Sequence, residues 1–135
     1  MANVDDTNLR QRIMRSNTHK DTGPEIRVRK LLHSLGYRFR LHRTDLPGKP
    51  DIVLPKSKLV IFVNGCFWHQ HPGCPKASIP KTNIEFWKSK FQANRKRDIK
   101  NQIQLTEQGW QVVVIWECQT SDKEKLTKLL ELYLK

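Results

Sequence analysis

The sequence predicts an α/β fold, in which a mixed central β-sheet is flanked by helices around one hydrophobic core. Three observations support this fold class: apolar residues at helical spacing near both ends, short apolar runs between turns, and the order helix, strands, helix, strand, helix. A chain of 135 residues is long enough for one core and too short for two. We therefore expect a single domain over residues 21–135, preceded by a basic segment over residues 1–20.

The first well-defined helix is expected to begin at a cap formed by Asp21 or Thr22 and to end at Gly36. Pro24 suits its first turn, where no backbone N–H is needed. The apolar residues of this segment recur at helical spacing, at Val28, Leu31, Leu32 and Leu35.

Three strands and a polar segment are expected next. Residues 37–41 alternate apolar and basic side chains, which is typical of a half-buried strand. Residues 51–54 and 59–63 are apolar runs, which are typical of buried strands. A compact segment rich in cysteine and histidine then occupies residues 66–74.

A long helix is predicted over residues 83–108. Thr82 and Glu85 have the spacing of a capping box at its start, and Gly109 suits its end. Basic residues dominate its middle, and its apolar residues are Trp87, Phe91, Ile99, Ile103 and Leu105.

The chain is expected to close with a strand and a helix. Residues 112–116 form another uninterrupted apolar run, typical of a buried strand. Ser121 and Glu124 have capping-box spacing ahead of a final amphipathic helix.

Charge is the outlier of the composition. The chain carries 25 Lys and Arg against 13 Asp and Glu, a formal net charge of +12. Such an excess attracts polyanions, and nucleic acid is the leading partner because binding it releases counterions from phosphates. An anionic membrane is the alternative, but no apolar run approaches the roughly 20 residues that span a bilayer. The polar, acidic start has no signal-peptide pattern, so we expect a cytoplasmic protein.

The three cysteines suggest a metal site. An odd number of cysteines, Cys66, Cys74 and Cys118, argues against a disulfide framework in such a chain. Thiolates together with an imidazole favour tetrahedral Zn²⁺, and a closed site of this kind stabilises structure rather than performing chemistry. Both His69 and His71 have suitable spacing for the imidazole ligand.

Asp51 follows Pro50 at the start of a predicted strand. A carboxylate at a strand edge, near a second ligand on the next strand, can hold Mg²⁺ against a phosphodiester, as in the restriction-endonuclease-like core. The alternative is an ordinary turn containing an aspartate. The second half of that nuclease pattern, an acidic residue followed two positions later by lysine, is missing from the stretch 63–65.

Two longer motifs carry a resemblance to a known family. Residues 47–51 read Pro-Gly-Lys-Pro-Asp, and residues 65–69 read Gly-Cys-Phe-Trp-His. In this order the motifs resemble those of the very-short-patch repair (Vsr) endonucleases, a variant of the restriction-endonuclease-like fold with a structural zinc site. The similarity runs over nearly the whole chain and includes Glu85-Phe86-Trp87, Arg97-Asp98, Gly109-Trp110 and Trp116-Glu117-Cys118.

The resemblance implies a role for each residue of the centre. Asp51 would bind the catalytic Mg²⁺, and the backbone carbonyl of Val63 would replace a second acidic ligand. His69 would be the general base, oriented by Asp98, and Glu25 would hold water in the outer shell of the metal ion. Glu25 could instead be an ordinary helix residue, and Asp98 a partner of Arg95 or Arg97. The zinc ligands implied are Cys66, His71, Cys74 and Cys118.

The resemblance also implies how DNA is contacted. Phe67, Trp68 and Trp87 would wedge into the base stack beside a mismatch, and Met14 would enter from the other groove. Phe67 and Trp68 lie on a tight loop that suits core residues poorly, whereas Trp87 could equally be core. Basic residues of the N-terminal segment and of residues 88–100 would contact phosphates.

One position departs from the family pattern. Asn64 stands where the family typically has histidine. Asparagine can donate a hydrogen bond to a phosphate oxygen but cannot carry a proton or a charge in this pH range. Lys49 or His19 could supply the missing positive charge.

The resemblance therefore implies a Mg²⁺-dependent DNA mismatch nickase that cuts 5′ of the thymine in a G·T pair. We expect it to act as a monomer on double-stranded DNA in the bacterial cytoplasm, associated with the nucleoid. The alternatives are a related nicking or restriction endonuclease with another target, and a zinc-stabilised DNA-binding module without cleavage.

Overall fold

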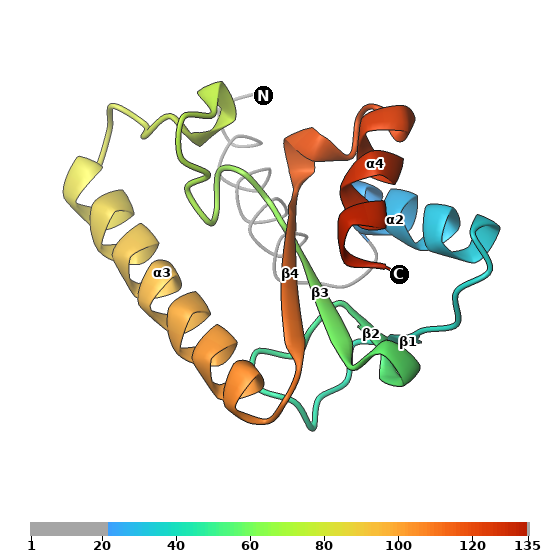
Figure 1. Ribbon diagram of the computed structural model, residues 1–135. Coiled ribbons are helices and arrows are strands. Elements are labelled where there is room, and N and C mark those ends of the chain that lie inside the picture. Colours follow the sequence, from blue (N-terminus) through green and yellow to red (C-terminus); the bar gives the residue numbers. More distant parts are fainter. Residues whose placement is uncertain (1–21, 135) are drawn as a thin grey trace, which may run out of the picture.

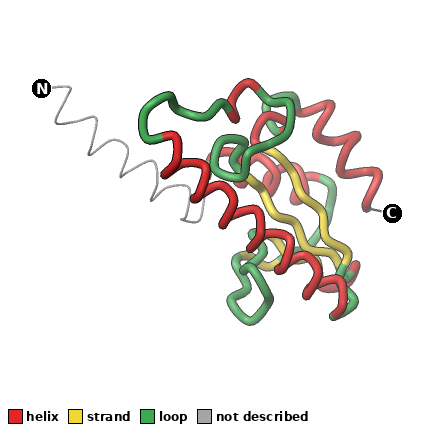
Figure 2. Tube along the Cα trace, turned by 90° about the vertical axis from the view of Figure 1, so that its left-hand side faces the viewer, coloured by secondary structure: helices red, strands yellow, loops and turns green. Residues whose placement is uncertain are grey.

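A four-stranded mixed sheet with helices on both faces forms the body of the molecule (Figures 1 and 2). The computed structural model describes residues 22–134, so the predicted basic segment, Met14 and His19 lie outside the described residues. The architecture confirms the predicted fold class. The elements are α2 (Gly23–Ser34), β1 (Arg40–Leu41), β2 (Ile52–Leu54), β3 (Leu59–Asn64), α3 (Ile84–Glu107), β4 (Gln111–Trp116) and α4 (Lys123–Tyr133).

The sheet has the order β1-β2-β3-β4. Its first two pairings are antiparallel, and β3 pairs with β4 in parallel. Three 3₁₀ turns, Pro55–Ser57, Pro75–Ala77 and Glu117–Gln119, lie between or after these elements. Within the described residues, no helix combines the length and the apolar character that crossing a membrane requires.

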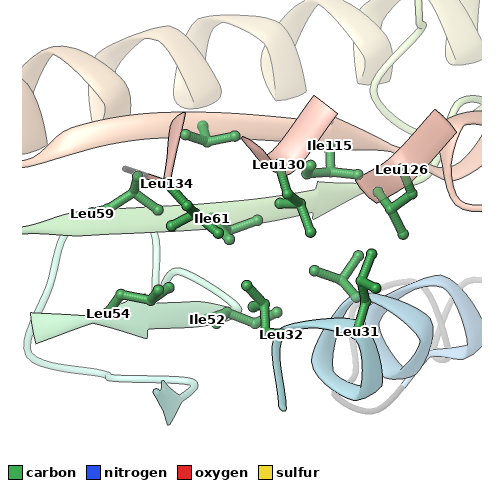
Figure 3. Close-up of a cluster of buried hydrophobic side chains, with 12 residues drawn as sticks. Leu31, Leu32, Ile52, Leu54, Leu59, Ile61, Ile115, Leu126, Leu130 and Leu134 are labelled. Atoms are coloured by element: carbon green, nitrogen blue, oxygen red, sulfur yellow. The ribbon is translucent and has the colours of Figure 1, made fainter. Parts of the chain in front are cut away.

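The core lies on both faces of the sheet because successive strand residues point to opposite sides. On one face, Ile52 and Ile61 pack with Leu32 of α2 and with apolar residues of α4 (Figure 3). On the other face, Val53 and Val60 pack with buried residues that include Leu105 of α3. The apolar runs of β2 and β3 are therefore buried from both sides.

Helix α3 turns a partly polar side inward, which the apolar pattern did not predict. Ile99 and Ile103, two of the apolar residues of the predicted helix, are 57% and 54% exposed. Asn94 and Asp98, on the opposite side of the helix, are buried or half-buried. Positions three and four apart share a helix face, so the inward face here combines apolar ends with a polar middle.

The helix starts differ from prediction in two of three cases. Thr22 caps α2 as expected, since its side-chain oxygen accepts a hydrogen bond from Glu25 N at 3.4 Å. The Thr82 capping box is wrong, because Asn83 occupies the cap position of α3 in a left-handed conformation without a side-chain bond. The Ser121 capping box is also wrong, because Asp122 caps α4 instead.

The observed strand boundaries also differ from those predicted. The strand predicted over residues 37–41 pairs with β2 only through Arg40 and Leu41. Tyr37 and Phe39 pack instead against the core cluster from the preceding connection. Strand β3, next to β2 in the sheet, runs one residue further than predicted, to Asn64.

The loop between Leu46 and Pro50 packs closely against α3. Its turn is closed by a hydrogen bond from Lys49 N to Leu46 O at 3.1 Å. Gly48 has φ +74°, and a Cβ atom there would lie 2.9 Å from Asn101 Cβ. Only glycine therefore fits this turn without displacing the helix, and the turn delivers Asp51 to the sheet.

Replacing Gly48 tests this close approach. We expect Gly48→Ala to lower the free energy of unfolding by about 2–4 kcal/mol, because it combines backbone strain with overpacking. The matched control is Gly109→Ala, where φ is +91° and nothing lies within 4 Å of the added Cβ. Urea denaturation measures both variants, and equal losses would show that Asn101 is not in the way.

Candidate active site

A cleft of about 690 Å³ opens between α3 and the ends of β2 and β3. Three of its lining residues are the predicted metal ligand Asp51, the predicted base His69 and its predicted partner Asp98. These residues are far apart in the sequence: Asp51 directly precedes β2, His69 lies in the loop after β3, and Asp98 lies on α3. The cleft is also lined by Val63, Asn64 and Trp68 among the residues named from the sequence.

Asp51 is a half-buried carboxylate that is hydrogen-bonded to the neighbouring strand. Its Oδ2 accepts a hydrogen bond from Val63 N at 2.7 Å. Burial raises the pKa of Asp51 to about 6, and the nearby negative charge of Glu25 acts in the same direction. The hydrogen bond from Val63 N and the nearby imidazoles of His42 and His69 lower this pKa without cancelling the effect of burial. A desolvated carboxylate of this kind fits a divalent cation, which would supply the missing positive charge.

His69 and Asp98 form a direct pair across the cleft. His69 Nδ1 lies 2.5 Å from Asp98 Oδ2, and both side chains are one-quarter exposed. Arg97, one of the two alternative partners of Asp98, donates a hydrogen bond to Asn94 instead. A carboxylate on Nδ1 keeps a proton there and leaves Nε2 as the acceptor, which is the state that a general base requires.

Asn94 supports this pair and was not singled out in the sequence. Its Nδ2 donates a hydrogen bond to the backbone carbonyl of Trp68 at 3.0 Å, directly before His69. The sequence did offer one indication of its role. Asn94 is a polar residue on the same side of the helix as Phe91 and Asp98, the side that faces the sheet.

Glu25 lies behind Asp51 and is 1% exposed. Its Oε2 accepts hydrogen bonds from Arg29, one turn further along α2, and lies 2.7 Å from His42 Nε2. The carboxylates of Glu25 and Asp51 and the imidazole of His42 have ligand atoms within 4.8 Å of one another. His42 was missed in the sequence because it belongs to none of the motifs.

The four predicted zinc ligands also come together. One ligand atom from each of Cys66, His71, Cys74 and Cys118 lies within 4.8 Å of the others. His71 Nδ1 lies 3.4 Å from Cys118 Sγ and 3.7 Å from Cys66 Sγ. Of the two candidate histidines, the structure brings His71 to the cysteines and His69 to the cleft.

The donor chemistry of this cluster fits a soft cation. Burial raises the pKa of the Cys66 thiol to about 12, so this sulfur becomes a thiolate only when a positive charge is supplied next to it. The His71 ring stacks on Trp116, with centroids 4.3 Å apart. Three thiolates and one imidazole are a donor set typical of tetrahedral structural Zn²⁺ sites.

The aromatic residues expected at the DNA form a packed cluster. Trp68 and Trp87 are 9% and 8% exposed and pack with Phe91 and the half-buried Phe67. The inference that this loop suits core residues poorly is therefore wrong for Trp68. The four rings join the loop after β3 to the first turns of α3, and only Trp68 among them lines the cleft.

Positive charge surrounds the cleft. Lys49, Lys90 and Arg97 line it directly. Other basic residues of α3 are exposed, namely Lys88, Arg95, Lys96 and Lys100. Lys49 therefore lies where it could replace the charge that Asn64 lacks, and Asn64 itself is 7% exposed at the cleft wall.

The raised pKa of Asp51 predicts a pH-dependent effect of Asp51→Asn on stability. The folded-state pKa lies above the ordinary 3.8, so ionisation disfavours folding, and stability falls between about pH 4 and 6. Without added Mg²⁺, the variant should be more stable than the native chain at pH 7.5, by up to about 3 kcal/mol. At pH 4 the two should differ little. Denaturation of the zinc-loaded protein at both pH values measures this, and equal differences at both would contradict it.

Loss of one thiolate should destabilise the cysteine cluster. We expect Cys118→Ser to reduce the zinc content and to lower the melting temperature by about 5 °C or more, which a loss of roughly 2 kcal/mol gives in a domain of this size. Metal analysis and thermal melting measure both quantities. As a control, the substitution should change little in protein already stripped of zinc, and an unchanged zinc content in the variant would contradict the ligand role.

The chain resembles several nucleases over most of its length. It is 52% identical over 113 residues to the type II nicking enzyme V.XorIIP of Xanthomonas oryzae pv. oryzae, covering 84% of this chain and 82% of that protein. It is 42% identical over 134 residues to the type II nicking enzyme V.NmeAIP of Neisseria meningitidis, covering 96% of this chain and 95% of the relative. It is also 42% identical over 127 residues to the DNA mismatch endonuclease Vsr of Escherichia coli, covering 94% and 81%.

A solved structure and a family match complete the comparison. The catalytic domain of the homing endonuclease I-Bth0305I has a TM-score of 0.53 and covers 85% of this chain and 100% of that domain. Its sequence identity of 21% supports the fold alone. The family described as DNA mismatch endonuclease Vsr matches residues 2–76, more than half of the chain. The chain therefore belongs to the DNA mismatch endonuclease Vsr family.

Proposed function

We propose that this DNA endonuclease nicks one strand of duplex DNA, 5′ of a thymine mispaired with guanine, and leaves a 5′-phosphate. The observation that carries the proposal is the convergence of Asp51 and the His69–Asp98 pair in one cleft lined by basic side chains. Membership of the Vsr family supplies the reaction class. We also propose a monomer that acts at the bacterial nucleoid, since one short basic domain suits an asymmetric lesion.

His69 is the proposed general base. With the proton held on Nδ1 by Asp98, Nε2 can accept a proton from the attacking water. The carboxylate of Asp98 then stabilises the imidazolium that forms, and it also fixes the ring orientation. Asn94 assists indirectly, because it holds the backbone carbonyl of Trp68 next to the base.

Asp51 and the backbone carbonyl of Val63 are the proposed ligands of the catalytic cation, taken to be Mg²⁺. When bound, such an ion neutralises negative charge that develops on the phosphate. The chain itself holds Asp51 in place through Val63 N, and it sets Glu25 beside it as a second negative charge. Asn64 and Lys49 are the proposed contacts to phosphate oxygens, and structural Zn²⁺ is proposed for the cluster of Cys66, His71, Cys74 and Cys118.

Mismatch selection is proposed to use the aromatic cluster. A mispaired step is easier to unstack than a paired one, so a ring that wedges into it also selects it. Phe67 is the half-buried member of the cluster, while Trp68 faces the cleft from a buried position. Trp87 supports both from α3, and Met14 is proposed to act from the other groove.

A second candidate is a nicking enzyme with a different DNA target. Its support is specific: two of the relatives compared above have names that describe type II nicking enzymes without mention of a mismatch. Target choice depends on contacts to base edges. A DNA-binding module without cleavage is the third candidate, and Asn64 is its support.

A nicking assay separates these candidates. Labelled duplexes with one G·T pair or only paired bases are incubated with zinc-loaded protein, with and without Mg²⁺. We expect one cut, 5′ of the mispaired thymine, and only with Mg²⁺. His69→Gln should slow cutting by at least about 100-fold, because a general base is removed. The exposed His33 provides the control substitution, His33→Gln, which should cut normally.

Each other outcome favours another candidate. Equal cutting of paired and mismatched duplexes would favour a different target, and no cutting of any duplex would favour the binding module.

The same substrates test the proposed aromatic wedge through Phe67→Leu. This substitution should reduce the preference for G·T roughly tenfold while overall DNA affinity changes little. Equal losses of mismatch preference and of overall DNA affinity would contradict a wedging role for Phe67. Trp68→Ala is unsuitable, since deleting a buried tryptophan costs about 3–5 kcal/mol of stability.

A further inference from the structure

Lys58, which directly precedes β3, lies beside the ring of Trp110. Its Nζ is 4.3 Å from the centroid of that ring, and the guanidinium carbon of Arg43 is 5.9 Å from the same centroid. The face of an aromatic ring attracts a cation. Trp110 is itself fixed, because it is 9% exposed and packs in a core cluster with Leu105 of α3. Two positive charges are therefore held at one place on the surface.

These three residues, Lys58, Arg43 and Trp110, form a basic-aromatic patch that adjoins the cleft. Leu46 packs in the same core cluster as Trp110 and also lines the cleft. Strands β3 and β4 begin side by side, at the end of the sheet where α3 ends (Figure 1). None of the three patch residues lines the cleft itself. The basic-aromatic patch therefore continues the cleft past the end of α3.

The backbone at Lys58 has a conformation that lysine rarely adopts. Its φ of +53° lies in the left-handed region, which glycine and asparagine adopt more readily. Its N–H donates to Pro55 O at 3.2 Å, and its carbonyl accepts from Gln111 N at 2.8 Å. Lys49, which lines the cleft, has a similar φ of +49° on the turn before β2. An exposed lysine at such a position points to a role for its charge.

The ammonium group of Lys58 is free to accept an anion. Arg43 is already paired with Asp45, to which its guanidinium donates two hydrogen bonds, at 3.0 and 2.5 Å. Within residues 22–134, no carboxylate lies within ion-pair distance of Lys58. An anion can therefore bind Lys58 without breaking an ion pair. Because the ring already restricts the side chain, less conformational entropy is lost on binding.

We propose that Lys58, held over Trp110 beside Arg43, binds a backbone phosphate of duplex DNA outside the cleft. The inference rests on the proposed function, because it takes duplex DNA as the substrate of the neighbouring cleft. A phosphate contact carries no sequence information, so it should add equally to the affinity for mismatched and paired DNA. The competing explanation is that Lys58 only covers Trp110 and stabilises the fold.

The salt dependence of DNA affinity tests the contact. Affinity of the zinc-loaded protein for labelled duplexes, with a G·T pair or only paired bases, is measured without Mg²⁺. Each phosphate contact adds about 0.9 to the slope of log affinity against log salt concentration. Lys58→Asn should therefore weaken binding roughly tenfold in about 0.05 M salt and roughly threefold in about 0.2 M salt. The loss should be equal on the two duplexes.

Three further variants separate charge from stability. Lys58→Arg keeps the positive charge and should keep the native salt slope. Lys58→Gly also removes the charge but accepts the left-handed φ, and its melting temperature reports whether the fold is intact. Lys125→Asn changes an exposed lysine of α4, which packs on the opposite face of the sheet, and should alter neither affinity nor slope. A native salt slope in both Lys58→Asn and Lys58→Gly would overturn the proposal.

Shortened duplexes locate the contact along the DNA. Each duplex is shortened on one side of the G·T pair. On one of the two, the difference between the native chain and Lys58→Asn should vanish, because the contacted phosphate is missing. A difference that persists on both would place the contact inside the cleft and overturn the proposal.

The nicking assay, run in parallel, separates this inference from the proposed function. A protein that nicks the G·T duplex, but whose salt slope does not depend on Lys58, would retain the function and lose the phosphate contact. A slope that falls in Lys58→Asn, in a protein that nicks no duplex, would do the reverse.

Discussion

The parallel pairing of β3 with β4 is the constraint on which both candidate centres depend. The register runs from Leu59 opposite Gln111 to Asn64 opposite Trp116. Because parallel strands end at the same edge of a sheet, the segments that follow them are neighbours. Glu117 Oε1 therefore accepts a hydrogen bond from Cys66 N at 3.3 Å. A one-residue slip would turn the buried side chains of β4 to the wrong face and separate the two segments.

The loop after β3 serves both centres at once. Cys66, His71 and Cys74 lie on the side of the cysteine cluster, and His69 lies between them in sequence but points to the cleft. Helix α3 fixes the cleft side of this loop through Asp98 and Asn94. The general-base role proposed for His69 would benefit from such support, because the proton must be accepted at a fixed point.

The sequence patterns predicted the body of the fold because its interactions are mostly apolar and periodic. The buried runs of β2, β3 and β4 and the extent of α3 were found within one or two residues. The two helix caps were each predicted one residue too early, at Thr82 instead of Asn83 and at Ser121 instead of Asp122. Which of two adjacent residues caps a helix depends on backbone geometry, which local composition does not determine.

The cleft explains what periodicity alone did not predict. The apolar residues Ile99 and Ile103 are exposed, because the inward face of α3 carries polar residues where it lines the cleft. The grouping of Asp51, His69 and Asp98 could be predicted from the resemblance to a family. Such a resemblance carries information on residues that are distant in the sequence, which periodicity lacks. His42 and Asn94 escaped both approaches, because each acts only through contacts that the folded chain creates.

The cysteine cluster also bears on how the chain assembles. Three of its donors lie close together along the chain, whereas the fourth, Cys118, is 52 positions from Cys66. An ion held by all four would act as a cross-link, and closing a loop of that length lowers the entropy of the unfolded chain by an amount equivalent to about 4 kcal/mol. The local donors can engage an ion early, but the closing bond must wait until the two parallel strands have met.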